Sequence, residues 1–153
     1  MKEMNIRLLT DLNEKPLDLL YLADPSEDAV TDYLTRGSCY LGFINDELVG
    51  EYVLLPTRPL TVELVNLAVD ERFHNKGYGK QLVQHAISVA KNSNYKVLEV
   101  GTGDAGIGQL ALYQKCGFSI TGIDTNFFKK HCPQAIFENG IECRHMVRLS
   151  MDL

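Results

Sequence analysis

The chain has 153 residues and a mass of 17.2 kDa, a length typical of one compact domain that covers residues 1–153. Fifteen Lys and Arg against twenty Asp and Glu give a formal charge of −5, so there is no basic surface to indicate nucleic acid or an anionic membrane as a partner. The chain begins without an apolar signal-peptide core, contains no apolar run of about 20 residues, and has four widely spaced cysteines typical of reduced thiols. These features predict a soluble protein of the cytoplasm.

The first half of the chain predicts a short strand, two helices and a hairpin. Leucines at a helical period form the first helix, and the second is expected to begin with Asp24 as N-cap before Pro25 and to end at Gly37. A bend between Pro56 and Pro59 is expected to close this half. The strands are expected at residues 6–9, 39–44 and 48–54 and the helices at 12–22 and 24–37, with a hairpin turn at 45–47.

The second half predicts strands that alternate with helices. Residues 62–69 form a near-continuous apolar run, which is expected of a central strand covered on both faces. A glycine-rich turn and an amphipathic helix follow this strand. The later elements are a strand at 95–100, a helix at 108–116 capped by Gly117, and strands at 118–123 and 143–149. This order predicts an α/β (α+β) sandwich, with a mixed, partly parallel central sheet flanked by helices.

The turn between the central strand and the amphipathic helix has features of a phosphate-binding site. Gly77 and Gly79 allow the backbone to approach a ligand closely. The first N–H groups of the helix have no partner within it and carry a partial positive charge, to which Lys76 and Lys80 add full charges. On spacing alone such a glycine pair is more often an ordinary turn, and neither the P-loop nor the full G-x-G-x-x-G signature is present.

Two segments resemble motifs of the GNAT superfamily of acetyl-CoA-dependent N-acyltransferases. The run from Asn66 to Leu82 is similar to motif A, in which an L-A-V strand and an acidic turn precede [Q/R]-x-x-G-x-[G/A]. The run L-Y-Q-K-C-G-F at residues 112–118 is similar to motif B. Finding both in the right order is far more specific than finding either, and the later part of the chain also resembles a bacterial YvbK-like subgroup. The chain departs from the pattern at His74, where relatives have Gln or Arg, and at Gly106, where many have an Asn that binds the pantetheine arm.

The resemblance implies a GNAT fold with acetyl-CoA as co-substrate and no metal. The backbone of the central strand would bind pantetheine and polarise the thioester carbonyl, and the glycine turn would hold the pyrophosphate. The cofactor-binding residues implied are Leu67, Ala68, Val69, His74, Asn75, Lys76, Gly77, Tyr78, Gly79 and Lys80. His131, Cys132, Cys143 and His145 lack the usual zinc spacing, so a metal site is not expected.

The resemblance also implies a direct attack of an amine on the thioester. Tyr113 occupies the position of the family's general acid and would protonate the leaving thiolate, although an aromatic ring packed under the helix is the alternative. An ammonium of pKa about 10.4 must first lose a proton. Glu63 is the first candidate base, Glu99 the second and a water chain the third, and either carboxylate could instead be a solubilising charge at a strand end.

The function predicted from the sequence is acetyl transfer to a primary amine. A small-molecule amine is favoured over a protein N-terminus or lysine, and the first two helices and the C-terminal strands would form the acceptor pocket. A non-catalytic acyl-CoA-binding regulatory module and a purely structural domain stay open as alternatives. Members of the family are often dimers, so a homodimer is a further expectation.

Overall fold

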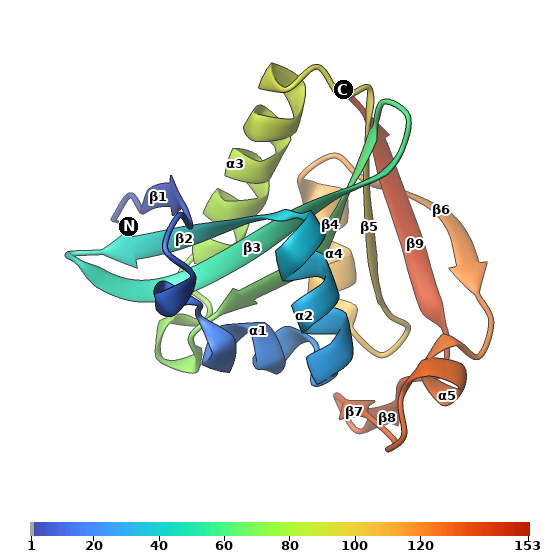
Figure 1. Cartoon of the computed structure of the whole chain (residues 1–153). Coiled ribbons are helices and arrows are strands. Elements are labelled where there is room, and N and C mark those ends of the chain that lie inside the picture. The colour runs from blue at the N-terminus through green and yellow to red at the C-terminus, as the bar shows by residue number, and fades with distance from the viewer. Residues whose placement is uncertain (1) are drawn as a thin grey trace.

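A mixed sheet of seven strands organises the structure, a computed structural model in which residues 2–153 are described (Figure 1). The strands, in their order across the sheet, are β1 (Asn5–Leu8), β2 (Ser38–Ile44), β3 (Glu47–Arg58), β4 (Thr61–Val69), β5 (Val97–Gly103), β9 (Met146–Asp152) and β6 (Ser119–Asp124). Neighbouring strands are antiparallel except β4 and β5, which are parallel. The predicted mixed, partly parallel sheet is therefore confirmed.

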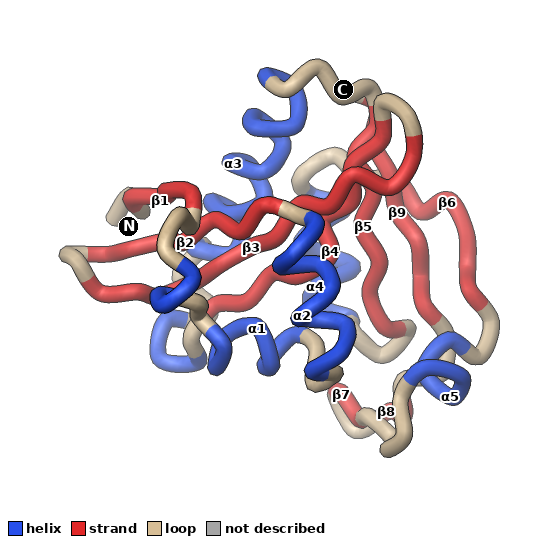
Figure 2. Tube along the Cα trace, in the orientation of Figure 1, coloured by secondary structure: helices blue, strands red, loops and turns tan. Residues whose placement is uncertain are grey.

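Helices cover both faces of the sheet, as Figure 2 shows. The helices α1 (Leu17–Ala23) and α2 (Glu27–Arg36) lie on one face, and α3 (Tyr78–Asn92) and α4 (Ile107–Lys115) on the other (Figure 1). The short helix α5 (Phe127–His131) and the hairpin of β7 (Phe137–Glu138) and β8 (Ile141–Glu142) lie between β6 and β9 in the chain. Two further 3-10 turns cover Leu12–Glu14 and Glu71–Phe73.

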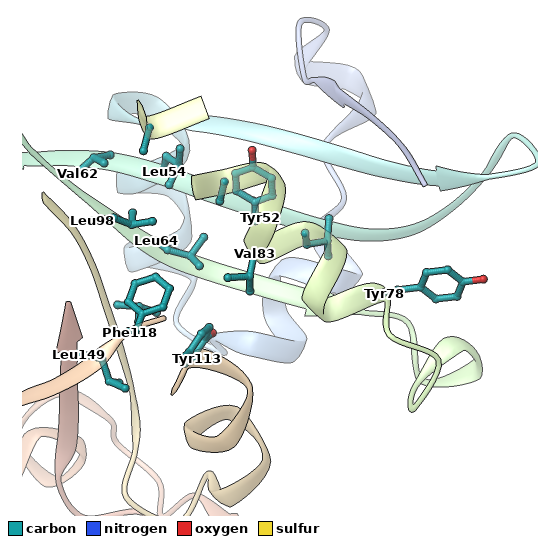
Figure 3. Packing of buried hydrophobic residues seen from close by; sticks show 14 of the residues in the cluster. Tyr52, Leu54, Val62, Leu64, Tyr78, Val83, Leu98, Tyr113, Phe118 and Leu149 are labelled. Carbon is teal, nitrogen blue, oxygen red and sulfur yellow. The ribbon is translucent and has the colours of Figure 1, made fainter. Parts of the chain in front are cut away.

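Each face of the sheet buries its own hydrophobic cluster. Under α3 and α4, the fully buried Val83 packs against sheet residues such as Leu64 and Leu98 (Figure 3). Leu82 and Ala86 of α3 belong to the same cluster. Under α1 and α2, a second cluster is built from Leu20, Val30, Tyr33, Cys39, Leu41, Val53 and Leu55. Because β3 and β4 contribute side chains to both clusters, the apolar run predicted for the central strand has the expected cause.

Several predicted boundaries are wrong. The helix expected over residues 12–22 is divided into a 3-10 turn and α1, and the strand expected at 143–149 is β9, which begins only at Met146. Ser26, not Asp24, is the N-cap of α2, since its Oγ accepts from the Ala29 N–H at 3.2 Å, while Asp24 ends α1. The strand β3 also continues past Pro56 to Arg58, and the bend comes only after it. Its pairing with β2 stops at Leu54, so Pro56 has a free edge where its missing N–H costs nothing. The patterns in the sequence also did not predict α5, β7 and β8.

Candidate active site

The strands β4 and β5 separate halfway along their length. Their pairing ends at Leu64 and Val100, yet β4 continues to Val69 and β5 to Gly103. On its other side β4 carries a bulge, because Leu64 pairs with Leu54 and Asn66 with Val53, which leaves Val65 without a partner on β3. A bulge bends its strand and increases the local twist, so it directs the second half of β4 away from β5. An unpaired strand edge results.

The N–H groups of Leu67 and Val69 point to this unpaired edge. The Asp70 N–H donates to Val49 O of β3 at 2.8 Å, and successive N–H groups of a strand alternate between its two edges. The Ala68 N–H is therefore directed to β3, and those of Leu67 and Val69 to the gap. Two of the three strand residues predicted to bind the cofactor thus present free donors there.

The N-terminus of α3 lies at the end of β4 and carries further free donors. Gly77, its N-cap, has φ +83°, a conformation that favours glycine, and it makes no side-chain cap. The first intrahelical bond is donated by Gln81 to Gly77 O at 3.2 Å, so the N–H groups of Tyr78, Gly79 and Lys80 precede it. A Cβ on Gly79 would meet only Leu112 Cδ2 at 3.5 Å, which leaves this turn open to a ligand. This donor set fits a pyrophosphate.

Two of the predicted cofactor-binding residues have side chains that are already engaged. His74 Nε2 lies 2.6 Å from Val69 O, so the ring is bound to the end of β4. Tyr78 is buried and its ring contacts Phe73, with the centroids 6.2 Å apart. These residues can therefore offer backbone groups, while Lys76 and Lys80 supply the charged side chains of the turn.

Tyr113 combines burial with a free hydroxyl group. Its ring packs edge-on against Phe118, with the centroids 5.8 Å apart (Figure 3), and only 5% of the residue is exposed. The hydroxyl makes no hydrogen bond to any residue in the range 2–153. Burial, and then the nearby Glu51 carboxyl, raise the pKa of Tyr113. The phenol is therefore protonated at neutral pH, as a proton donor must be.

The two candidate bases both lie beside cations. Glu63 and Glu99 face each other in the β4–β5 ladder. Glu63 Oε2 is 3.4 Å from Arg148 Nη1, and burial raises the pKa of this carboxyl against the opposing effect of Arg148. Glu99 Oε2 is bound more closely, 2.7 Å from Arg58 Nη2. Burial therefore makes Glu63 a more basic carboxylate than an exposed glutamate.

Glu51 of β3 is a buried carboxyl that the sequence reasoning missed. It is 0% exposed, neither oxygen has a hydrogen-bond partner, and burial raises its pKa well above the usual range. Its one signal in the sequence is a charged residue within the apolar run Val49 to Leu55. Such a residue is informative because an unpaired buried carboxyl is costly.

Two further classes of site find no support in the described chain. Within residues 2–153, no three His, Cys, Asp or Glu side chains are grouped so that they could hold a metal ion. No helix in the same range is both long enough and apolar enough to span a membrane.

Comparison with known proteins agrees with this geometry. Residues 6–118 match the acetyltransferase (GNAT) family model. The chain is 55% identical to the N-acetyltransferase YvbK of Bacillus subtilis over 153 residues, which are 100% of this chain and 99% of YvbK. A B. subtilis acetyltransferase solved with CoA is 55% identical, with a TM-score of 0.95 and 99% of both chains covered. A GNAT acetyltransferase from Elizabethkingia anophelis solved with acetyl-CoA is 48% identical over 100% of both chains, with a TM-score of 0.97. The chain therefore belongs to the GNAT family and is an acetyltransferase that uses acetyl-CoA.

Proposed function

We propose that this enzyme transfers the acetyl group of acetyl-CoA to a primary amine of a small molecule. One combination of features carries the proposal. The Tyr113 hydroxyl is protonated and makes no hydrogen bond, and the second half of β4 is separated from β5 and has free N–H groups. These are the groups that acyl transfer from a thioester needs, namely donors for the carbonyl and a proton for the thiolate.

The co-substrate would be held along the open edge of β4. The Leu67 and Val69 N–H groups would bind the pantetheine arm and the thioester carbonyl. One such donor, aimed at the oxygen as its charge develops, could contribute about 3 kcal/mol. The N–H groups of Tyr78, Gly79 and Lys80 would bind the pyrophosphate, with Lys76 as a further cation.

Two side chains would move the protons. Glu63 would accept a proton from the acceptor ammonium, since burial raises the pKa of its carboxyl toward that of an effective base. Tyr113 would donate its phenolic proton to the leaving thiolate of CoA. Glu99 is the less suitable base because its carboxylate is already bound by Arg58, with Oε2 2.7 Å from Nη2.

A Tyr113→Phe variant tests the general-acid role. We expect kcat to fall by about 10²–10⁴-fold, because the phenylalanine ring keeps the packing against Phe118 but has no proton to give. Acetyl-CoA affinity, measured by calorimetry, should stay that of the wild type. An unchanged kcat would rule out the role.

An acceptor screen separates the remaining functions. The purified protein is titrated with acetyl-CoA, CoA and ATP, and CoA release is then measured with small amines and with peptides that carry a free N-terminus or lysine. Binding of both CoA species with turnover on small amines supports the proposal, whereas turnover on peptides alone indicates a protein acetyltransferase. Binding without turnover indicates a regulatory acyl-CoA module, and no binding leaves the fold with another role.

We also propose the cytoplasm as its compartment. The four cysteines, Cys39, Cys116, Cys132 and Cys143, are all free thiols. Free thiols persist where the environment is reducing.

A further inference from the structure

Three buried oxygens under α1 and α2 have no hydrogen-bond partner in the described chain. They are Oε1 and Oε2 of Glu51 and Oδ1 of Asn66. Glu51 pairs with Ala68, and Val53 with Asn66, across the β3–β4 ladder. Opposite residues share a face of the sheet, as do residues two apart on a strand, so Glu51 and Asn66 are diagonal neighbours within reach of a long side chain.

The amide group of Asn66 connects β4 to both covering helices. Its Nδ2 donates to Leu20 O of α1 at 3.0 Å and to Tyr33 Oη of α2 at 2.5 Å. Asn66 follows the bulge at Val65 and precedes Leu67, whose N–H points to the open edge of β4. One side chain therefore sets the position of α1 and α2 relative to the strand that would bind the thioester.

The surroundings of Glu51 favour its neutral form. The titratable groups around it are Tyr33 of α2, Cys39 of β2 and Tyr113 of α4, whose pKa values it raises, and Asp24 at the end of α1 acts on Tyr33. None of these is a cation, and Leu41, which lies opposite Glu51, and Val53, two residues along β3, belong to the apolar cluster of this face. A protonated carboxyl supplies one O–H donor, and among the buried side chains of residues 2–153 Asn66 Oδ1 is the one unpartnered acceptor outside the carboxyl itself.

We propose that Glu51 donates its carboxyl proton to Asn66 Oδ1, and that the resulting chain from Glu51 through Asn66 to Leu20 O and Tyr33 Oη holds α1 and α2 against β4. Glu51 and Asn66 are positioning residues in this arrangement. Ionisation of Glu51 removes the donor and places a negative charge beside the amide oxygen, so the helices loosen as the pH rises. The consequence for the acceptor rests on the proposed function, together with the expectation that α1 and α2 form part of the acceptor pocket.

A substrate-free measurement tests whether the Glu51 carboxyl is the protonated donor that the hydrogen-bonded chain needs. In Glu51→Gln the side-chain amide can donate to Asn66 Oδ1 at every pH, whereas Glu51→Leu has no donor. Unfolded glutamate ionises at a pKa of about 4.3 and folded Glu51 at a higher one, so the folded wild type binds more protons between these values and loses stability as the pH rises through them. We expect the thermal midpoint of the wild type to fall relative to that of Glu51→Gln from about pH 5 to about pH 9. A constant difference between the two proteins over this range would overturn the proposal.

Kinetics then separate a positioning role from a catalytic one. Glu51→Gln should keep kcat, with an acceptor KM that no longer rises with pH. Glu51→Leu should raise the acceptor KM by about tenfold, the effect of one lost hydrogen bond, and leave the KM of acetyl-CoA unchanged. Loss of kcat in a stably folded Glu51→Gln would mean that Glu51 itself carries a reacting proton, which would overturn the positioning role. Absence of turnover in the wild type would instead contradict the proposed function, and the thermal measurement would still decide whether Glu51 is the protonated donor.

Discussion

His74 and Gly106 depart from the family motifs, and each has a contact that explains it. His74 binds Val69 O at 2.6 Å, which fixes the end of β4 next to a free N–H group. At Gly106, a Cβ would lie 2.8 Å from Thr102 Oγ1 and 3.1 Å from Gly103 O. An Asn at this position would therefore require the Thr102 side chain to move and the Gly103 carbonyl to give way slightly. Neither departure removes the backbone donors on which cofactor binding would depend.

Alanine at two nearby glycines should have opposite effects on stability. Gly106→Ala forces a close contact and should destabilise the protein by about 1–3 kcal/mol. Gly108 lies in the first turn of α4 with nothing within 4 Å of its Cβ position, so Gly108→Ala should stabilise by about 0.4–1 kcal/mol through the helix preference of alanine. Denaturant unfolding of both variants measures the difference. Equal shifts in the free energy of unfolding would mean that the Thr102 side chain moves aside without cost.

At the level of elements, the N-terminus of α3 depends on its two glycines for different reasons. Gly77 is needed for its backbone, with φ +83°, whereas Gly79 has a negative φ and free space for a side chain. The first requirement concerns folding, and the second concerns access of the ligand. Separate measurements can therefore distinguish them.

We expect Gly77→Ala to lower the free energy of unfolding by about 1–2 kcal/mol, the cost of a left-handed conformation. Gly79→Ala should leave stability unchanged or slightly raised, yet weaken acetyl-CoA binding because the new methyl group occupies the approach to the first N–H groups of α3. Thermal unfolding and calorimetry are the two readouts. A Gly79→Ala variant with wild-type affinity would place the pyrophosphate elsewhere.

The elements that could be predicted are those whose signal is local. The apolar run of β4, the glycine turn and the stripe of α3 are each legible within one segment. The bulge at Val65 was not, because it exists only in the pairing of β4 with β3. The five-residue α5 and the two-residue strands β7 and β8 are too short for a hydrophobic pattern to repeat within them, so periodicity could not predict them.

At the scale of the whole molecule, the part of the site that sequence patterns could not predict is the part formed by segments far apart in the chain. Tyr113 was predicted from the resemblance to a family and Glu63 from its place at the start of the central strand, since no spacing in the sequence relates the two. Glu51 was missed because its isolation is produced jointly by β2, β3, β4 and the two helices above them. Burial of a polar group is a tertiary property, and one charged residue in an apolar run does not show whether a partner lies opposite.

The distribution of charge over the whole molecule gives a last prediction. Residues 72–98, which contain the glycine turn and α3, hold five Lys and Arg and no Asp or Glu, whereas residues 11–36 hold seven Asp and Glu and two Lys and Arg. If the local field at the turn governs binding, salt weakens the attraction for anionic acetyl-CoA, and its Kd should rise a few-fold between about 20 mM and about 300 mM salt. If the net charge of −5 governs it, salt should lower the Kd. Calorimetry at both salt concentrations decides the sign, and a Lys76→Gln, Lys80→Gln double variant should lose most of the rise, because its cations next to the free N–H groups of α3 are gone.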